Sequence, residues 1–135
     1  MTEPAPGARL HHVAVQTADL GRARRFYETA LGCSVIKTER TAKGRDIVWL
    51  ACGDCRIELY SAKPGQSLAA GWNANGVGPL ALGFYVRDLD AEVTRLAALQ
   101  VRITKSPYEP VPGERAAMIE GPDGEEIVLL ERVVA

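Results

Sequence analysis

The sequence predicts an α+β protein built from two tandem βαβββ modules. Three observations support this: an internal repeat, two capped helical patterns, and three strand-like runs after each helix. The chain has 135 residues, with 47% hydrophobic and 24% charged residues, the size and composition of one globular domain. We therefore expect a single domain over residues 1–135, with module one at about 9–62, a linker at about 63–78 and module two at about 79–134.

The repeat relates residues 10–20 to residues 79–89, and each copy is a short strand pattern that ends in Asp-Leu. Asp19 and Asp88 are suited to cap the helices that follow, because a carboxylate accepts hydrogen bonds from the free amides of a first turn. Gly32 is placed to end the first helix. The expected apolar stripes are Leu20, Ala23, Phe26, Ala30 and Leu31 in the first helix, and Leu89, Val93, Leu96, Ala97 and Leu99 in the second.

Strand candidates follow each helix, separated by Gly- and Asp-containing turns. In module one they are residues 34–41, 46–52 and 55–61; in module two they are 101–106, 115–120 and 126–133. Cys52 and Cys55 form a CxxC, but Gly53-Asp54 between two strand-like runs is typical of a two-residue hairpin. We favour the hairpin over zinc or redox chemistry.

Composition narrows the function classes. The net charge of -1, from 16 basic and 17 acidic residues, gives no electrostatic case for binding nucleic acid or an anionic membrane. No apolar run approaches the roughly 18 residues of a membrane span, and the polar, Pro-rich start has no apolar core of a signal peptide. The three cysteines fit a reducing compartment, so we expect a cytoplasmic protein.

Strand alternation predicts an unusually polar open face for module one. With Val13, Val15, Ile57 and Leu59 packed under the helix, the opposite face carries His12, Gln16, Trp49, Arg56, Glu58 and Tyr60. Leu82, Phe84 and Val86 pack inward in module two, which leaves a blander face of Ala81, Gly83, Tyr85, Met118 and Val128. His11 is expected on the helix side as a packing residue. Polar and aromatic groups on a sheet face indicate a ligand-facing surface.

Several of these segments resemble the vicinal oxygen chelate superfamily, which includes glyoxalase I, methylmalonyl-CoA epimerase, bleomycin resistance proteins and extradiol dioxygenases. They are His12–Leu20 with Phe26-Tyr27 and Leu31-Gly32, then Ile57–Tyr60, and Gly121–Ile127. The resemblance implies curved mixed sheets around a cavity, helices on the outer face, a small-molecule ligand and a homodimer.

In metal-dependent members of that family, the first and last strand of each module supply one ligand each. Carried over by position, His12 and Glu58 match this pattern, whereas Ala81 and Val128 stand at the other two positions and cannot bind a metal. We therefore expect no cofactor. The alternative is one divalent metal (Ni, Zn, Mn, Co or Fe) on His12 and Glu58, with Tyr60, Tyr85 or Glu126 as further donors.

Three functional hypotheses remain open. The first is a metal-free lyase, isomerase or cyclase in which His12 and Glu58 are catalytic. The second is a protein that sequesters a drug or toxin, with Trp72 adding to the stacking surface. The third is a metal-dependent glyoxalase- or epimerase-like enzyme with a non-standard ligand set. In each, the expected substrate-binding residues are Gln16, Trp49, Arg56, Tyr60, Ala81, Tyr85, Met118 and Val128. The bland alternative is that His12 and Glu58 are inherited remnants without a role.

Overall fold

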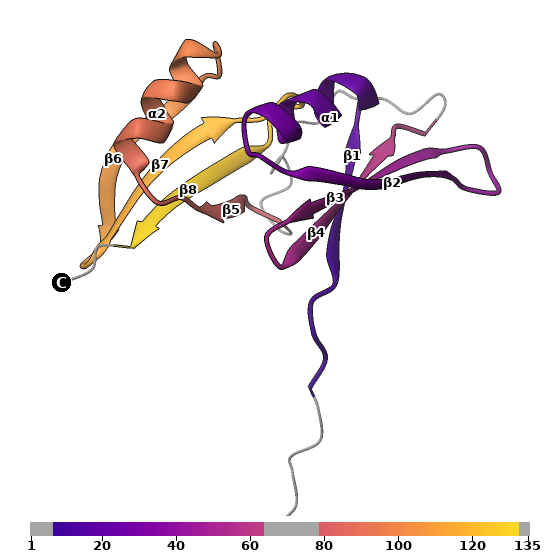
Figure 1. The fold of residues 1–135 in the computed structure, drawn as a ribbon, viewed down its shortest axis with the longest axis horizontal. Helices are drawn as coiled ribbons and strands as arrows, with labels where there is room; N and C mark the ends of the chain where they lie inside the picture. Colours follow the sequence, from indigo (N-terminus) through magenta and orange to yellow (C-terminus); the bar gives the residue numbers. More distant parts are fainter. Residues whose placement is uncertain (1–6, 64–78, 133–135) are drawn as a thin grey trace, which may run out of the picture.

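The computed structural model describes residues 7–63 and 79–132, and shows two copies of one module (Figure 1). Module one contains β1 (His12–Thr17), α1 (Leu20–Thr29), β2 (Ser34–Arg40), β3 (Asp46–Cys52) and β4 (Cys55–Ser61). Module two contains β5 (Leu82–Tyr85), α2 (Leu89–Ala98), β6 (Ile103–Val111), β7 (Glu114–Glu120) and β8 (Glu126–Arg132). The predicted tandem βαβββ fold is confirmed.

Each module forms a four-stranded mixed sheet with the same topology. The orders are β1-β4-β3-β2 and β5-β8-β7-β6, with a parallel pair between the first and last strand of each module and antiparallel pairs elsewhere. Both helices lie on the same side of the two sheets in Figure 1. In the part of the chain that the structure describes, no helix covers the other side of the sheets, as expected for a ligand-facing surface.

The predicted helix starts are confirmed. The Asp19 carboxylate accepts from the Arg22 amide at 3.0 Å, and the Asp88 carboxylate accepts from the Ala91 amide at 3.1 Å. These bonds satisfy first-turn amides that have no partner within the helix. The sequence therefore fixes where both helices begin.

The two modules share their apolar interior. Each has its own buried cluster, centred on residues such as Leu50 and Leu59 in one and Leu96 and Leu129 in the other. Four partly buried side chains pack against both clusters: Phe26, Leu31, Leu82 and Phe84. Because these residues come from α1, the turn that follows it and β5, the end of the first helix and the first strand of module two join the halves.

A polar contact reinforces this junction at the turn between β7 and β8. The Asp123 carboxylate accepts from the Thr17 hydroxyl at 2.5 Å and from the Ala18 amide at 2.9 Å. The Glu125 carboxylate, 1% exposed, accepts from the Tyr27 hydroxyl at 3.0 Å. Burial, together with the adjacent Glu125 charge, raises the pKa of Tyr27. A turn of module two is thus bound to the first strand and helix of module one.

Two elements of module two differ from the sequence-based expectation. β5 is only four residues long and starts at Leu82, so Ala81 lies just before the strand. β6 continues to Val111 through Pro107 and Pro110, with shifts in its register against β7. Prolines are tolerated there because β6 is an edge strand, where a missing amide breaks no inner ladder.

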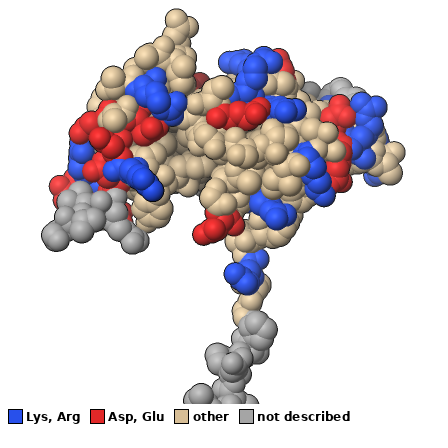
Figure 2. All heavy atoms as spheres, viewed as in Figure 1, with Lys and Arg blue, Asp and Glu red and all other residues tan. Residues whose placement is uncertain are grey.

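The described surface carries no large region of one charge in the view of Figure 2. Basic and acidic side chains are intermingled across this face, with uncharged surface among them. Among the described residues, neither helix has the length and apolarity needed to cross a membrane. The expected linker at 63–78 lies almost entirely outside the described residues.

Candidate functional site

The predicted polar side chains of module one do share one face of its sheet. Strand pairing places His12 opposite Arg56, Ala14 opposite Glu58, and Gln16 opposite Tyr60, and paired residues point to the same side. Trp49 pairs with Glu58 on the neighbouring strand, which places its ring on this face too. Three strands, β1, β3 and β4, therefore present the candidate site opposite α1.

At the centre of this face, His12 is bound to Glu58. The His12 Nε2 and Glu58 Oε2 atoms lie 2.6 Å apart, and the Glu58 side chain is only 5% exposed against 36% for His12. A buried carboxylate is costly unless it is hydrogen-bonded, and the His12 N–H provides that bond. The carboxylate holds the imidazole in one orientation, so that Nδ1 is the nitrogen that faces away from Glu58.

His11 is where the sequence interpretation is wrong. It was expected to pack on the helix side, but it is exposed and its Nδ1 lies 2.7 Å from Nδ1 of His12. Its ring also meets Trp49 edge-on at 5.9 Å, and its Nε2 lies 3.3 Å from the Arg56 guanidinium. β1 begins only at His12, so strand alternation does not constrain His11.

One arrangement of protons satisfies this whole chain of contacts. His12 donates from Nε2 to Glu58, so its Nδ1 carries a lone pair and accepts from Nδ1 of His11. Nε2 of His11 then carries a lone pair and accepts from Arg56. Both imidazoles are neutral in this arrangement, which leaves His12 able to take up a proton.

Trp49 forms the aromatic wall of the site. Its ring meets that of His12 edge-on at a centroid distance of 5.3 Å, and the Lys37 ammonium lies 5.1 Å from the Trp49 ring centroid. The indole Nε1 is buried and has no hydrogen-bond partner among residues 7–63 and 79–132. A buried indole N–H without a partner is unusual, so this N–H is available as a donor to a ligand.

Gln16 and Tyr60 lie further along the same face. Arg45 links them: its guanidinium donates to the Gln16 side-chain oxygen at 2.7 Å and lies 5.0 Å from the Tyr60 ring centroid. Arg45 is also anchored by the Ser61 carbonyl at 2.8 Å. At this end of the face, the Arg45 guanidinium is therefore held in place beside the Tyr60 ring.

The corresponding face of module two is apolar. Gly83 pairs with Val128 as Ala14 pairs with Glu58, and Met118 pairs with Val128 as Trp49 pairs with Glu58. Tyr85, 64% exposed, is the other predicted site residue on this strand pair. Within each module, the strand pairing therefore brings the predicted site residues onto one face of the sheet. Trp72 lies outside the described residues.

The donor set does not fit the metal centre that the fold family implies. In the described part of the chain, this face offers two protein donors at the family positions, His12 and Glu58, whereas a catalytic zinc typically has three protein ligands. No group of three His, Cys, Asp or Glu side chains converges among the described residues. Ala81 and Val128 supply no donor at the matching positions.

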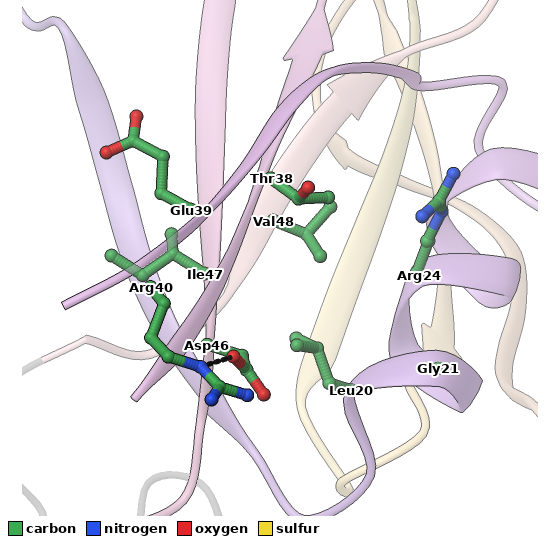
Figure 3. Close-up of a pocket in the computed structure, with 9 residues that line it drawn as sticks. All are labelled: Leu20, Gly21, Arg24, Thr38, Glu39, Arg40, Asp46, Ile47 and Val48. Atoms are coloured by element: carbon green, nitrogen blue, oxygen red, sulfur yellow. Dashed lines mark hydrogen bonds and ion pairs between the residues drawn. The ribbon is translucent and has the colours of Figure 1, made fainter. Parts of the chain in front are cut away.

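A separate hollow of about 500 Å³ lies on the helix side of the first sheet, between α1 and the β2–β3 hairpin (Figure 3). An Arg40–Asp46 ion pair of 2.8 Å stands at its edge. Its lining is Leu20, Gly21, Arg24, Thr38, Glu39, Arg40, Asp46, Ile47 and Val48. None of the predicted site residues lines it, so it is distinct from the His12 face.

Three residues of the site escaped the sequence analysis: His11, Lys37 and Arg45. Lys37 pairs with Trp49 across β2 and β3, so the strand register carried a usable signal. Arg45 lies in the β2–β3 turn region and reaches the face only through its long side chain. A turn residue has no face assigned by alternation, and sequence spacing does not locate it.

Comparisons with known proteins agree with this architecture. The Glyoxalase/Bleomycin resistance protein/Dioxygenase superfamily matches residues 9–129. The crystal structure of SMU.1112c is 30% identical, with a TM-score of 0.77 over 92% of this chain and 98% of that one. None of the curated proteins matches in sequence.

Two further structures share the fold at lower identity. The glyoxalase family protein from Bacillus cereus has a TM-score of 0.81 at 23% identity, over 96% of this chain and 97% of that one. TnmS3, an antibiotic binding protein from a Streptomyces species, has a TM-score of 0.73 at 22% identity, over 96% and 99%. The match over residues 9–129 is decisive for the family: the chain belongs to the Glyoxalase/Bleomycin resistance protein/Dioxygenase superfamily.

Proposed function

We propose that this protein is a metal-independent enzyme of the lyase, isomerase or cyclase type that acts on a small carbonyl compound. The observation that carries the proposal is the contact of 2.6 Å between His12 and the buried Glu58 on an open sheet face. A carboxylate behind an imidazole fixes its tautomer and increases its basicity. This is the arrangement needed to remove a proton from carbon next to a carbonyl group.

In this mechanism the reacting atom of the protein is Nδ1 of His12. A substrate that displaces His11 from its contact of 2.7 Å meets the lone pair on that nitrogen. The imidazolium formed by proton uptake is stabilised by the Glu58 carboxylate at Nε2. Arg56, exposed on the same face, is placed to stabilise negative charge that develops on the substrate oxygen.

Proton exchange tests the proposal without knowledge of the product. A panel of 2-oxo acids, hydroxyketones and aromatic ketones is incubated with the protein in deuterated water, and loss of the signal from the hydrogen next to the carbonyl is followed by NMR. Exchange should survive a chelator and fall about 100-fold or more in His12→Ala and Glu58→Gln. Glu126→Gln, which changes a carboxylate on β8, is the matched control.

The competing outcomes are distinct. Exchange that requires Ni, Zn, Mn, Co or Fe and fails with a chelator would establish a metal-dependent enzyme. In that case loss of activity in Glu126→Gln would identify a ligand from module two. Exchange that is the same in His12→Ala as in the unaltered protein would remove the pair from the mechanism.

A second candidate function is sequestration of an aromatic drug or toxin. It is favoured by the buried, unpartnered indole N–H of Trp49 and by the exposed Tyr85 ring. The antibiotic binding protein TnmS3 has this fold, so the fold accommodates such a role. Tight binding that quenches Trp fluorescence, with no exchange and no product, would select this alternative.

We further propose a homodimer in which the polar face of module one in one copy meets the apolar face of module two in the other. Each ligand site would then have a catalytic half and an apolar half. Light scattering during size exclusion should give about twice the chain mass of 14.6 kDa. A single species at the chain mass would contradict this arrangement.

A further inference from the structure

Two of the three cysteines meet on the helix side of the first sheet, away from the His12 face. The Sγ atoms of Cys33 and Cys52 lie 2.6 Å apart. Cys33 belongs to the buried cluster of module one, and Cys52 packs against that same cluster. The sulfur contact therefore sits inside the apolar layer beneath α1.

Chain geometry explains why these two thiols meet. Cys33 directly precedes β2, and Cys52 is the last residue of β3. Ser34 and Ala51, their immediate neighbours, form the pair that closes the open end of the β2–β3 hairpin. Cys33 and Cys52 thus lie side by side where the two strands part, although 19 positions separate them.

The sulfur environments of the two differ. Cys33 is 6% exposed and Cys52 is half-buried. The two thiols share one hydrogen bond, which raises the pKa of Cys33 and lowers that of Cys52. Cys52 is consequently the thiol that ionises first and meets solutes first.

We propose that Cys33 and Cys52 are a redox-active pair that forms a reversible disulfide by exchange with a low-molecular-weight disulfide such as oxidised glutathione. The Cys52 thiolate attacks one sulfur of the small disulfide, which releases one small thiolate and leaves a mixed disulfide. Cys33 loses its proton and attacks the Cys52 sulfur, which releases the second small thiol. The protein loses two hydrogens in all, and the small disulfide is reduced to two thiols.

Cys55 is the residue that the sequence motif would have paired with Cys52, but the sulfur contact of Cys52 goes to Cys33. Cys55 is exposed at the start of β4 and is the register partner of Cys52 across the Gly53-Asp54 turn, so it is the competing partner for the same thiol. The proposal therefore states that Cys52 forms its disulfide with Cys33 and not with Cys55. It does not depend on the proposed enzymatic function.

Peptide mapping by mass spectrometry tests that choice. The native protein is oxidised with an excess of oxidised glutathione, free thiols are alkylated, and the disulfide-linked peptides are identified. We expect a Cys33–Cys52 crosslink with Cys55 alkylated or carrying glutathione. The same oxidation in concentrated urea is the reference for unguided pairing, where the neighbours Cys52 and Cys55 should dominate.

Three variants and a melting measurement complete the test. Cys55→Ser is the matched control and should still form the crosslink, whereas Cys33→Ser should stop as a glutathione adduct on Cys52. Because the bond closes the hairpin, oxidation should raise the melting temperature by about 10 °C in the unaltered protein and in Cys55→Ser. Cys33→Ser and Cys52→Ser should show no such rise. A native Cys52–Cys55 crosslink, or three thiols left without an intramolecular bond, would overturn the proposal.

Discussion

Modules one and two have the same strand order and opposite surface chemistry. The strand register relates Glu58 and Trp49 of module one to Val128 and Met118 of module two, and the sequence repeat relates His12 to Ala81. The inward positions, in contrast, stay apolar in both: Val15 and Leu59 in one, Phe84 and Leu129 in the other. The fold depends on the inward set, so the outward set is free to become a site in one half and an apolar surface in the other.

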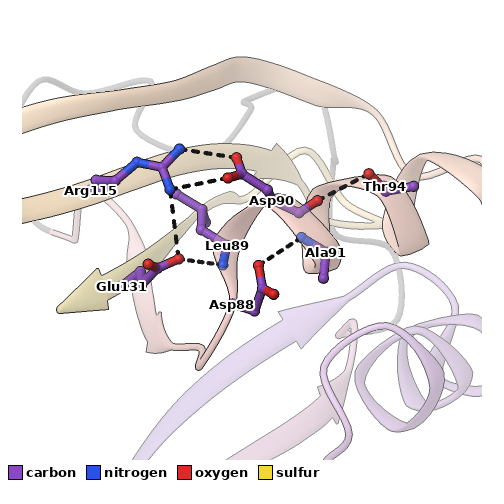
Figure 4. Close-up of polar contacts among 7 residues, drawn as sticks. All are labelled: Asp88, Leu89, Asp90, Ala91, Thr94, Arg115 and Glu131. Carbon is purple, nitrogen blue, oxygen red and sulfur yellow. Dashed lines mark hydrogen bonds and ion pairs between the residues drawn. The ribbon is translucent and has the colours of Figure 1, made fainter. Parts of the chain in front are cut away.

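The two helices are also anchored differently. The start of α2 is held by its own module: Glu131 on β8 accepts from the Leu89 amide, and Arg115 on β7 pairs with Asp90 at 3.0 Å (Figure 4). The segment before α1 is held from outside, because Thr17 and Ala18 bind Asp123 of module two. Module two is thus self-contained at this end, and module one, which carries the candidate site, depends on its neighbour.

The largest expected effect comes from making module two chemically equivalent to module one. The double change Ala81→His with Val128→Glu places a His–Glu pair at the positions that the internal repeat relates to His12 and Glu58. Four family-type ligands would then be present, and zinc or nickel affinity measured by calorimetry should rise about 100-fold or more. Each single change serves as the control, because it adds one donor and should give a smaller gain.

An unchanged affinity in the double variant, with an unchanged melting curve, would show that the two faces do not meet around one space. That outcome would also weaken the proposed dimer, in which polar and apolar faces combine.

The second-largest expected effect is a loss of stability when the contact between Glu125 of module two and Tyr27 of module one is disturbed. A Cβ added at Gly121 would collide with the Glu125 side chain, and that side chain is buried against Tyr27. Gly121→Ala should therefore lower the free energy of unfolding by about 2 kcal/mol in urea titrations. Gly83→Ala is the matched control, since a Cβ there meets nothing within 4 Å and the change should be within about 0.5 kcal/mol. Equal losses in both variants would contradict the idea of a tight junction.

Tyr27→Phe tests the same junction through pH. Burial and Glu125 raise the pKa of Tyr27 above its usual 10.0, so its contribution to stability is complete below that pH. As pH rises further, Tyr27 ionises in the unfolded chain first, and stability should fall by up to about 1.4 kcal/mol per pH unit. Tyr27→Phe should cost about 1–2 kcal/mol at pH 7 and lack this alkaline fall.

Urea titrations at pH 7 and pH 11 measure both effects. Tyr85→Phe, which changes an exposed ring, should behave like the unaltered protein. An alkaline fall that persists in Tyr27→Phe would assign the dependence to another group.

The sequence was sufficient to predict the modules because caps, turns and apolar periodicity are local. Asp19 and Asp88 cap as predicted, and Gly53-Asp54 turns between β3 and β4. The face of each inner strand followed from alternation, which placed Trp49 and Glu58 correctly side by side. Whether these residues bind or catalyse stays a prediction.

What the sequence did not predict involves groups outside regular strands or contacts between distant elements. His11 precedes β1, and Arg45 extends from a turn, so neither has a face set by period two. The Tyr27–Glu125 bond joins residues 98 positions apart, and no local pattern encodes that pairing. The same holds for Cys33, whose sulfur partner lies on another strand.

The smallest expected effect compares the two helix ends. After α1 the chain reverses at Gly32 with φ of 69°, and after α2 it reverses at Gln100 with φ of 64°. The Val101 amide donates to the Leu96 carbonyl at 3.0 Å, which is a common way for a helix to end. In such an ending the residue with positive φ is usually glycine, but here it is Gln100. A side chain in this backbone region is strained, and glycine is not. Gln100→Gly should therefore raise the free energy of unfolding by about 0.5–1 kcal/mol, and Gly32→Gln should lower it by a similar amount. Urea titration resolves both changes. If Gln100→Gly lowers stability instead, contacts of the Gln100 side chain outweigh the backbone strain, and the two helix ends are not equivalent although both have a residue with positive φ.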